Sequence, residues 1–172
     1  MRDRDVGKLM VEEMHLESFV DAFPLVTGRV IEITDRGESP DFEALIEGEP
    51  IGIELTEIRD LDDAGDYLAE VYRIASKKSA SYAKHGHFDA RPIILVCHSD
   101  ALPFHDFRGQ LEAQAYWDDF DNLGFAEIWL MDLSDAYYSA QDPRRPADLF
   151  GLKPEAWRGF QRYGSYDRKP FG

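Results

Sequence analysis

Apolar positions recur along this chain with the periods of both helices and strands. Helical spacing of apolar residues predicts helices over residues 8–23, 66–84 and 107–123. Alternating or continuous apolar runs predict strands over residues 28–34, 42–46, 51–56, 91–97 and 125–133. The resulting order, αβββαβαβ, predicts an α/β fold in which helices cover both faces of a mixed central sheet, a three-layer sandwich.

The second and third predicted strands are expected to form a hairpin across a four-residue turn. If Ile46 faces Ile51 across that turn, Glu54 lies diagonal to Asp41 on the same face of the sheet. Diagonal neighbours stand roughly 7–8 Å apart at the backbone, so both carboxylates could reach one ion between them. Glu43 would lie directly opposite Glu54, and a cluster of three acids would be relieved by a bound cation.

Two short segments in this hairpin carry a resemblance. Pro40-Asp41 precedes the first strand, and Glu54-Leu55-Thr56 lies in the second. An Asp after Pro, a β-turn and then Glu in an apolar strand resemble the PD-(D/E)xK nuclease superfamily, whose layout would cover residues 10–135. The resemblance implies a restriction-endonuclease-like fold and a site in which Asp41, Glu54 and the carbonyl oxygen of Leu55 hold Mg2+ or Mn2+.

One position departs from the family's motif. The family has a lysine two residues after the glutamate, where this chain has Thr56, and some members supply that lysine from the following helix. Lys78 lies at the edge of the inward face of helix 66–84, whereas Lys77 points away from it, so Lys78 is the candidate for the displaced lysine. The competing interpretation is a flanking lysine that keeps its ammonium group in water.

The acids have competing interpretations too. The resembling family often contributes an acid from the first helix, which makes Glu13 and Glu17 candidates, although an exposed helical face accounts for either one. Asp41 and Glu54 could be solvated residues at the edge of a hairpin. Apolar residues flank Glu54 on both sides in its strand, however, and an ionised group in such surroundings needs a partner.

The resemblance implies a metal-dependent, nuclease-like phosphodiesterase that acts on nucleic acid, with Asp41, Glu54 and Lys78 as its catalytic residues. Two alternatives stay open. One is a catalytically inactive acidic protein on the same fold that binds or inhibits a basic protein partner, and the other is a hydrolase of small phosphoesters. Many nucleases of this type pair up, so a homodimer is a further expectation, and the choice between DNA and RNA stays open.

Charge is unevenly distributed along the 172 residues, whose net charge is −15. We expect one α/β domain over residues 1–142 and a basic, aromatic extension over residues 143–172. The extension has seven basic and three acidic residues, a net charge of +4, which leaves −19 for the remaining chain. Its aromatic residues could stack nucleic acid bases, but Trp157 and Phe160 at helical spacing favour packing on its own domain.

Hydropathy, the single cysteine and the histidines narrow the range of possible functions. No apolar run approaches the roughly 20 residues that span a bilayer, so we expect a soluble, cytoplasmic protein without a membrane partner. Cys97 lies in a predicted buried strand, which favours a packing role over a nucleophilic one. The histidines form no metal-ligand spacing in the sequence, although His98 follows the central strand and could face a ligand pocket.

Overall fold

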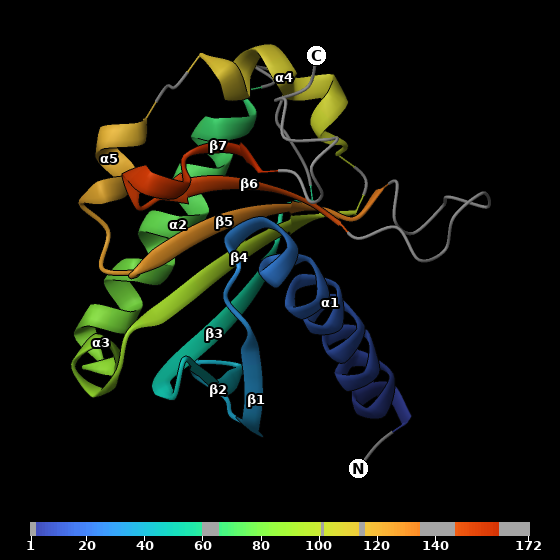
Figure 1. Ribbon diagram of the computed structural model, residues 1–172, viewed down its shortest axis with the longest axis vertical. Helices are drawn as coiled ribbons and strands as arrows, with labels where there is room; N and C mark the ends of the chain where they lie inside the picture. Colours follow the sequence, from blue (N-terminus) through green and yellow to red (C-terminus); the bar gives the residue numbers. More distant parts are fainter. Residues whose placement is uncertain (1–2, 60–65, 101, 114–115, 135–146, 162–172) are drawn as a thin grey trace.

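The computed structural model describes residues 3–59, 66–100, 102–113, 116–134 and 147–161 (Figure 1). The helices are α1 (Asp3–Thr27), α2 (Tyr67–Lys84), α3 (His87–Ala90), α4 (Phe104–Glu112), α5 (Trp117–Asp121) and the short 3-10 helix η1 (Glu155–Trp157). The strands are β1 (Ile31–Arg36), β2 (Phe42–Ile46), β3 (Glu49–Glu57), β4 (Ile93–Ser99), β5 (Glu127–Asp132), β6 (Asp148–Lys153) and β7 (Gly159–Gln161).

The seven strands form one mixed sheet in the order of the chain, β1 to β7. β3, β4 and β5 are parallel neighbours, and the strands on either side of them pair antiparallel. β4 is buried along its whole length, as a central strand covered on both faces should be. The predicted α/β fold with a mixed sheet is therefore confirmed.

Two apolar cores lie on the two faces of this sheet. On one face, Phe19 and Phe23 of α1 pack with Ile53 and Trp129 of the sheet. On the other face, α2, α4 and α5 cover the strands, and their core residues are Val71, Leu111 and Phe120. Full burial of one large apolar side chain contributes roughly 1.5–3 kcal/mol, so both layers of helices hold the sheet firmly.

The register of the β2–β3 hairpin differs from the prediction by two residues. Ile46 pairs with Glu49 rather than Ile51, because Glu47 and Gly48 both adopt positive φ angles, 53° and 81°, and close the hairpin in two residues. Pro50 consequently lies within β3 instead of in the turn predicted at residues 47–50. The Gly52 N–H donates a hydrogen bond to the Pro92 carbonyl on the β4 side of β3. The nitrogen of Pro50, two residues earlier, faces the same side at a point before the pairing with β4 begins, so its lack of an N–H costs no hydrogen bond of that ladder.

This register brings the acids of the hairpin into a different arrangement. Phe42 pairs with Ile53, so Asp41, just before β2, lies opposite Glu54 rather than diagonal to it. The prediction that Glu43 lies directly opposite Glu54 is wrong, because Glu43 pairs with Gly52. A side chain at position 52 would also collide with Pro40, because a Cβ there would stand 2.5 Å from the proline Cγ. The absence of a side chain at Gly52 therefore lets the Pro40 ring pack against β3, immediately before Asp41.

The carboxyl-terminal half departs from the prediction in two places. The helix expected over residues 107–123 is two helices, α4 and α5, with Ala113 as the residue that ends the first. The described part of the predicted extension enters the sheet as β6 and β7, and Trp157 and Phe160 pack against the two cores from η1 and β7 instead of from one helix. The predicted boundary at residue 142 and the segment 162–172 lie outside the described residues.

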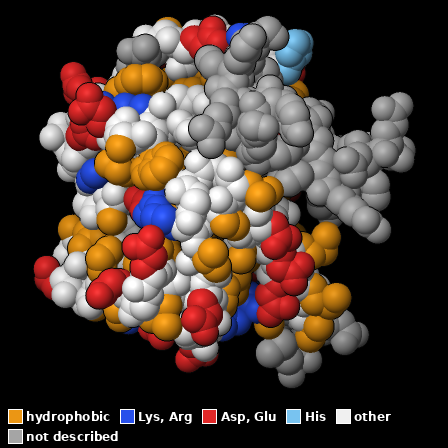
Figure 2. All heavy atoms as spheres, in the orientation of Figure 1, with side chains coloured by type: hydrophobic (Ala, Val, Ile, Leu, Met, Phe, Trp, Pro, Cys, Tyr) orange, Lys and Arg blue, Asp and Glu red, His pale blue; other side chains and the backbone are white. Residues whose placement is uncertain are grey.

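The described surface is mixed in character. On the face shown in Figure 2, acidic side chains are scattered among apolar ones, and basic side chains are fewer. Within the described part of the chain, no helix combines the length and apolarity required to cross a bilayer. Cys97 is fully buried, and burial raises the pKa of its thiol to about 12, which agrees with the packing role predicted for it.

Candidate metal-binding site

Two carboxyl groups meet where β2 begins and β3 continues past it. Glu54 leaves β3 on the face covered by α2 and is 5 % exposed, whereas Asp41 is half-buried. Asp41 Oδ2 accepts a hydrogen bond of 2.9 Å from the backbone N–H of Leu55, so the Asp41 side chain takes the place of a β2 backbone partner. The two acids predicted from the sequence are therefore neighbours. The edge of β3 holds Asp41 through the Leu55 N–H, and Glu54 is buried on the face of the sheet under α2.

The closeness of the two acids changes the protonation of Asp41. Burial, a hydrogen bond with Glu54 and the negative charge of Glu54 together raise the pKa of Asp41 from 3.8 to about 7. The Leu55 N–H and the Lys78 ammonium group act in the opposite direction and lower it. Without a cation, the pair consequently holds a proton that a divalent ion placed between the two groups would displace.

Helix α2 brings two further groups to Glu54. Lys78 Nζ lies 3.6 Å from Glu54 Oε2, and the Tyr82 hydroxyl donates a hydrogen bond to the same oxygen. Burial and the adjacent Glu54 raise the pKa of Tyr82, so its hydroxyl stays protonated and serves as a donor. Lys77 is exposed on the opposite side of α2. Asp41, Glu54 and Lys78 thus come together in space, while their chemical roles stay predictions.

The Leu55 carbonyl, the third predicted metal ligand, points toward the same edge of β3 as Asp41. A strand residue directs its N–H and its C=O to one neighbouring strand, and the Leu55 N–H points to Asp41. β2 begins at Phe42, which pairs with Ile53, so position 55 lies beyond the residues that pair with β2. The orientation of the backbone therefore suits a carbonyl ligand at this point.

Other acids considered from the sequence lie elsewhere. Glu43 forms an ion pair with Arg91, and Glu13 on α1 forms one of 2.8 Å with Arg36 on β1. Glu17 is exposed on α1. Thr56, two residues after Glu54, shares its side of β3 by strand alternation, which places the family's lysine position on the face that α2 covers. Lys78 approaches that face from the helix.

A cavity of about 320 Å³ adjoins the Asp41 carboxyl group. Its lining includes Asp41 and Leu55 from the hairpin region, His15 from α1 and His98 from β4. Lys8 and Arg59 add basic side chains to the same lining, and Glu12 and Glu57 add acidic ones. Two larger hollows, of about 610 and 580 Å³, are lined by other parts of the described chain, so the smaller cavity is the one of these three that borders Asp41.

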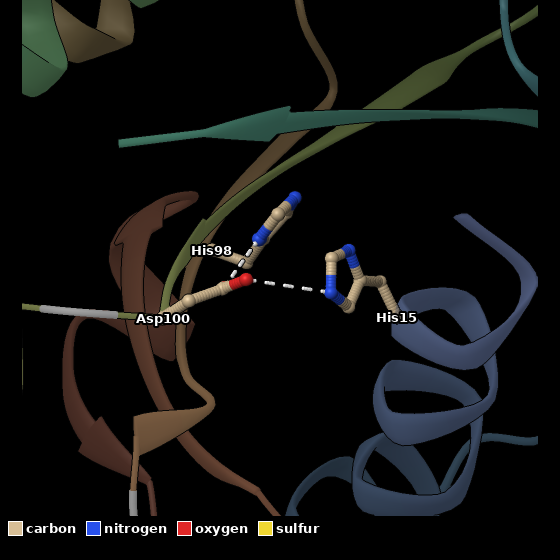
Figure 3. Close-up of side chains that lie close together, drawn as sticks. All are labelled: His15, His98 and Asp100. Atoms are coloured by element: carbon tan, nitrogen blue, oxygen red, sulfur yellow. Dashed lines mark hydrogen bonds and ion pairs between the residues drawn. The ribbon is translucent and has the colours of Figure 1, made fainter. Parts of the chain in front are cut away.

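A second polar cluster, not predicted from the sequence, borders this cavity. It consists of His15, His98 and Asp100, which the structure draws from α1, β4 and the residue after β4 (Figure 3). His98 Nδ1 lies 2.9 Å from Asp100 Oδ1, and His15 Nε2 lies 3.5 Å from Asp100 Oδ2. The two imidazole rings are 4.2 Å apart between centroids and tilted by 48°. We call these three residues the histidine cluster.

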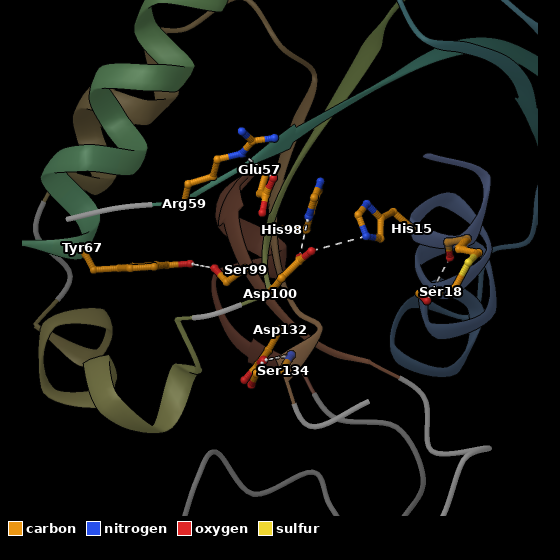
Figure 4. A network of polar contacts seen from close by, with 11 residues as sticks. His15, Ser18, Glu57, Arg59, Tyr67, His98, Ser99, Asp100, Asp132 and Ser134 are labelled. Atoms are coloured by element: carbon orange, nitrogen blue, oxygen red, sulfur yellow. Dashed lines mark hydrogen bonds and ion pairs between the residues drawn. The ribbon is translucent and has the colours of Figure 1, made fainter. Parts of the chain in front are cut away.

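The surroundings of the histidine cluster oppose a positive charge on His15. Burial, followed by the nearby His98, lowers the pKa of His15, although Asp100 acts against this change. The hydrogen bond from His98 lowers the pKa of Asp100. Figure 4 shows the neighbouring polar residues, among them Glu57 and Arg59 beside His98, and Tyr67 bonded to Ser99. Burial thus favours the neutral form of His15, and the hydrogen bond favours the ionised form of Asp100.

Only part of the histidine cluster left a signal in the sequence. His98 follows a predicted central strand, and the carboxyl end of such a strand is a common place for a ligand pocket. His15 lies in the predicted first helix, far away in the chain, and its approach to His98 depends on how α1 crosses the sheet. Comparison of the chain with family models, with curated proteins and with solved structures found no match.

Proposed function

We propose that this protein is a metal-dependent phosphodiesterase that cleaves nucleic acid, built on a restriction-endonuclease-like form of the α/β sandwich. The observation that carries the proposal is the meeting of Asp41, Glu54 and Lys78 from three separate segments of the chain. An acid pair with an adjacent lysine can hold a hard cation and also face a phosphate.

The donor set of the paired acids fits Mg2+ or Mn2+. Asp41 and Glu54 offer carboxylate oxygens and Leu55 offers a carbonyl oxygen, the ligand types that these ions prefer. The raised pKa of Asp41, caused by burial and by Glu54, means that the acids repel one another when both are ionised. A divalent cation would remove this repulsion, and it would supply Lewis-acid activation of water and neutralisation of charge on the phosphate.

The neighbouring side chains would position the reacting groups. Lys78, one third exposed and 3.6 Å from Glu54, would orient the attacking water or stabilise negative charge on the phosphate in the transition state. Tyr82 would hold the Glu54 carboxylate in place through its donated hydrogen bond. Lys8 and Arg59 line the cavity beside Asp41, where a phosphate group could approach. The lining also contains Glu12 and Glu57, and Glu57 forms an ion pair with Arg59. Binding of a phosphate backbone against the net charge of −15 would therefore depend on the bound cation.

Glu54→Gln tests the proposal, with Glu43→Gln as the matched control. Both glutamates point to the same side of the β2–β3 hairpin, but Glu43 is paired with Arg91, away from Asp41. We expect Glu54→Gln to lower Mn2+-dependent cleavage of labelled DNA or RNA by about 100-fold or more, while Glu43→Gln stays within about twofold of the parent. Circular dichroism should show the same fold in all three proteins.

Several outcomes would overturn the proposal. Equal activity in Glu54→Gln and the parent protein would remove the acid pair from the mechanism. Absence of both cleavage and saturable Mn2+ binding in the parent would instead favour the acidic binding or inhibitor protein. Cleavage of a small phosphodiester, without cleavage of any DNA or RNA, would favour the small-phosphoester hydrolase.

A further inference from the structure

The histidine cluster has the composition and spacing of a metal site of a different type. Its three ligand atoms all lie within 4.8 Å of one another. The distance from His15 Nε2 to Asp100 Oδ2, 3.5 Å, exceeds that of an ordinary hydrogen bond. It is close to the separation of about 3.3 Å that two ligand atoms have on a tetrahedral ion with bonds of about 2.0–2.1 Å.

We propose that His15, His98 and Asp100 bind one divalent transition-metal ion of the class that prefers imidazole ligands, represented by Zn2+. Two imidazoles and a carboxylate suit such an ion, whereas Mg2+ prefers oxygen ligands throughout. This inference is independent of the proposed nuclease activity, because it uses none of the residues assigned to that reaction.

The burial of the histidine cluster supports a site rather than a chance surface contact. The side chains of His15 and His98 are 9 % and 6 % exposed, and that of Asp100 is 33 % exposed. α1 and β4, which hold the two histidines, pack tightly into the core on that face of the sheet through Phe19 and Val96. The ligands are therefore held by rigid elements, which lowers the entropic cost of binding an ion.

Binding would require only a small rearrangement. His98 Nδ1 and Asp100 Oδ1 now form a hydrogen bond of 2.9 Å (Figure 3). The ion would take the place of this hydrogen bond, with the ring proton of His98 on Nε2 so that Nδ1 is free to coordinate. His98 Nδ1 and Asp100 would then separate by about 0.4 Å to reach the spacing of tetrahedral ligands.

The site would keep one coordination position for another ligand. His15 and His98 both line the cavity of about 320 Å³, which is large enough to admit water or a small anion. Three protein ligands with an open fourth position are typical of zinc sites that bind or activate a ligand, whereas structural zinc sites have four protein ligands. The inferred site is therefore accessible from the cavity and not sealed.

Calorimetric titration of the metal-free chain with ZnCl2 tests this inference directly. We expect one Zn2+ per chain, unaffected by millimolar Mg2+, and visible absorption typical of tetrahedral coordination when CoCl2 replaces ZnCl2. His15→Asn and His98→Asn should each lower the Zn2+ affinity by about 30-fold or more, whereas His105→Asn, at an exposed position of α4, should leave it within about twofold. A hundredfold excess of Zn2+ over Kd should raise the parent's Tm by about 5–10 °C.

Asp100→Asn separates the loss of a metal ligand from the loss of the fold. Asp100 is partly exposed after the end of β4, so its replacement should leave the metal-free Tm nearly unchanged while weakening Zn2+ binding. Equal Zn2+ affinity in the parent, Asp100→Asn and His105→Asn would overturn the inference. It would also be overturned if the parent bound no Zn2+ in the micromolar range.

Discussion

Glu54 on β3 and His98 on β4 belong to neighbouring parallel strands, but their side chains leave the sheet on opposite faces. Glu54 points to α2, where it contacts Lys78 and Tyr82. His98 points to α1, where it contacts His15 and Asp100. One sheet thus presents an oxygen-rich cluster with its own cation on one face and an imidazole-rich cluster with a carboxylate on the other.

The two clusters differ in how their charge is balanced. Glu54 has a lysine ammonium group 3.6 Å away, so a cation bound there would add to existing positive charge beside a substrate phosphate. The two imidazoles of the other cluster share the single carboxylate of Asp100, so a bound ion would be partly neutralised by its own ligands. The first arrangement suits phosphoryl chemistry and the second suits retention of a borderline-soft metal.

Lys78→Met should produce the largest difference between the clusters. Methionine keeps much of the side-chain volume but removes the ammonium group beside Glu54, so we expect cleavage to fall by about 100-fold. Zn2+ affinity at the histidine cluster should not change. Lys77→Met, on the exposed side of the same helix, is the matched control and should cleave at nearly the parent rate. Equal rates in the two variants would assign Lys78 a structural role only.

Removal of one ligand from each cluster, with both metals measured in each variant, sharpens the comparison further. Glu54→Gln should weaken Mn2+ binding by about 30-fold or more and leave Zn2+ binding within about twofold, and His98→Asn should show the reverse. The reason is that Glu54 and His98 leave the sheet on opposite faces and that the two ligand sets differ in donor type. Paired calorimetric titrations measure both affinities in each variant. A parallel loss of both metals in both variants would show that the clusters form one site.

The fold was predictable where the apolar pattern is continuous. The run of apolar residues in β4 identified the central strand, and the spacing of Val71 and Ala75 identified the inward face of α2. β6 was missed because Gly151 interrupts its apolar run and Pro154 follows it closely. A side chain at position 151 would collide with the backbone of Trp157, so that glycine reflects tertiary packing that local patterns do not report.

The paired acids were found despite an incorrect register. Side chains in a strand alternate with a period of two, so a shift of two residues kept Glu54 on the same face as Asp41 and only moved it closer. The positive φ of Glu47, which caused the shift, is unusual for a residue other than glycine and has no signature in the sequence. His15 and His98 could not be paired from the sequence, because only the packing of α1 on the sheet brings them together.

Tyr82→Phe should have a moderate effect confined to the acid pair. The substitution removes the hydrogen bond donated to Glu54 and leaves the packed ring, which contacts Phe88 and Phe125. A hydrogen bond to a charged group contributes about 1.5–3 kcal/mol, so we expect Mn2+ affinity to fall by about tenfold or more, with Zn2+ affinity unchanged. Tyr72→Phe on the same helix is the control. An unchanged Mn2+ affinity in Tyr82→Phe would mean that Glu54 needs no such support.

The smallest expected effect is a pH dependence of stability that belongs to Asp41. Its pKa is raised to about 7 in the folded protein because of burial and Glu54. The folded state therefore binds this proton more tightly than the unfolded state. The resulting stability is present in full below the unfolded pKa of 3.8 and is lost as the pH rises through about 7. Metal-free protein should accordingly lose stability from this group as the pH rises from about 4 to about 8.

Asp41→Asn fixes the neutral form of this side chain, and its amide oxygen can still accept the hydrogen bond from Leu55. Because Asp41 is only half-buried, we expect an effect near 1 kcal/mol, which changes Tm by roughly 2–4 °C in a chain of this length. Thermal unfolding with a chelator should show a smaller fall in Tm between about pH 5 and about pH 8 in the variant than in the parent. Mn2+ should reduce the fall in the parent alone, because the ion replaces the proton that Asp41 otherwise needs. The same pH dependence in both proteins would mean that the two acids do not share a proton, and the case for a cation between them would lose its electrostatic basis.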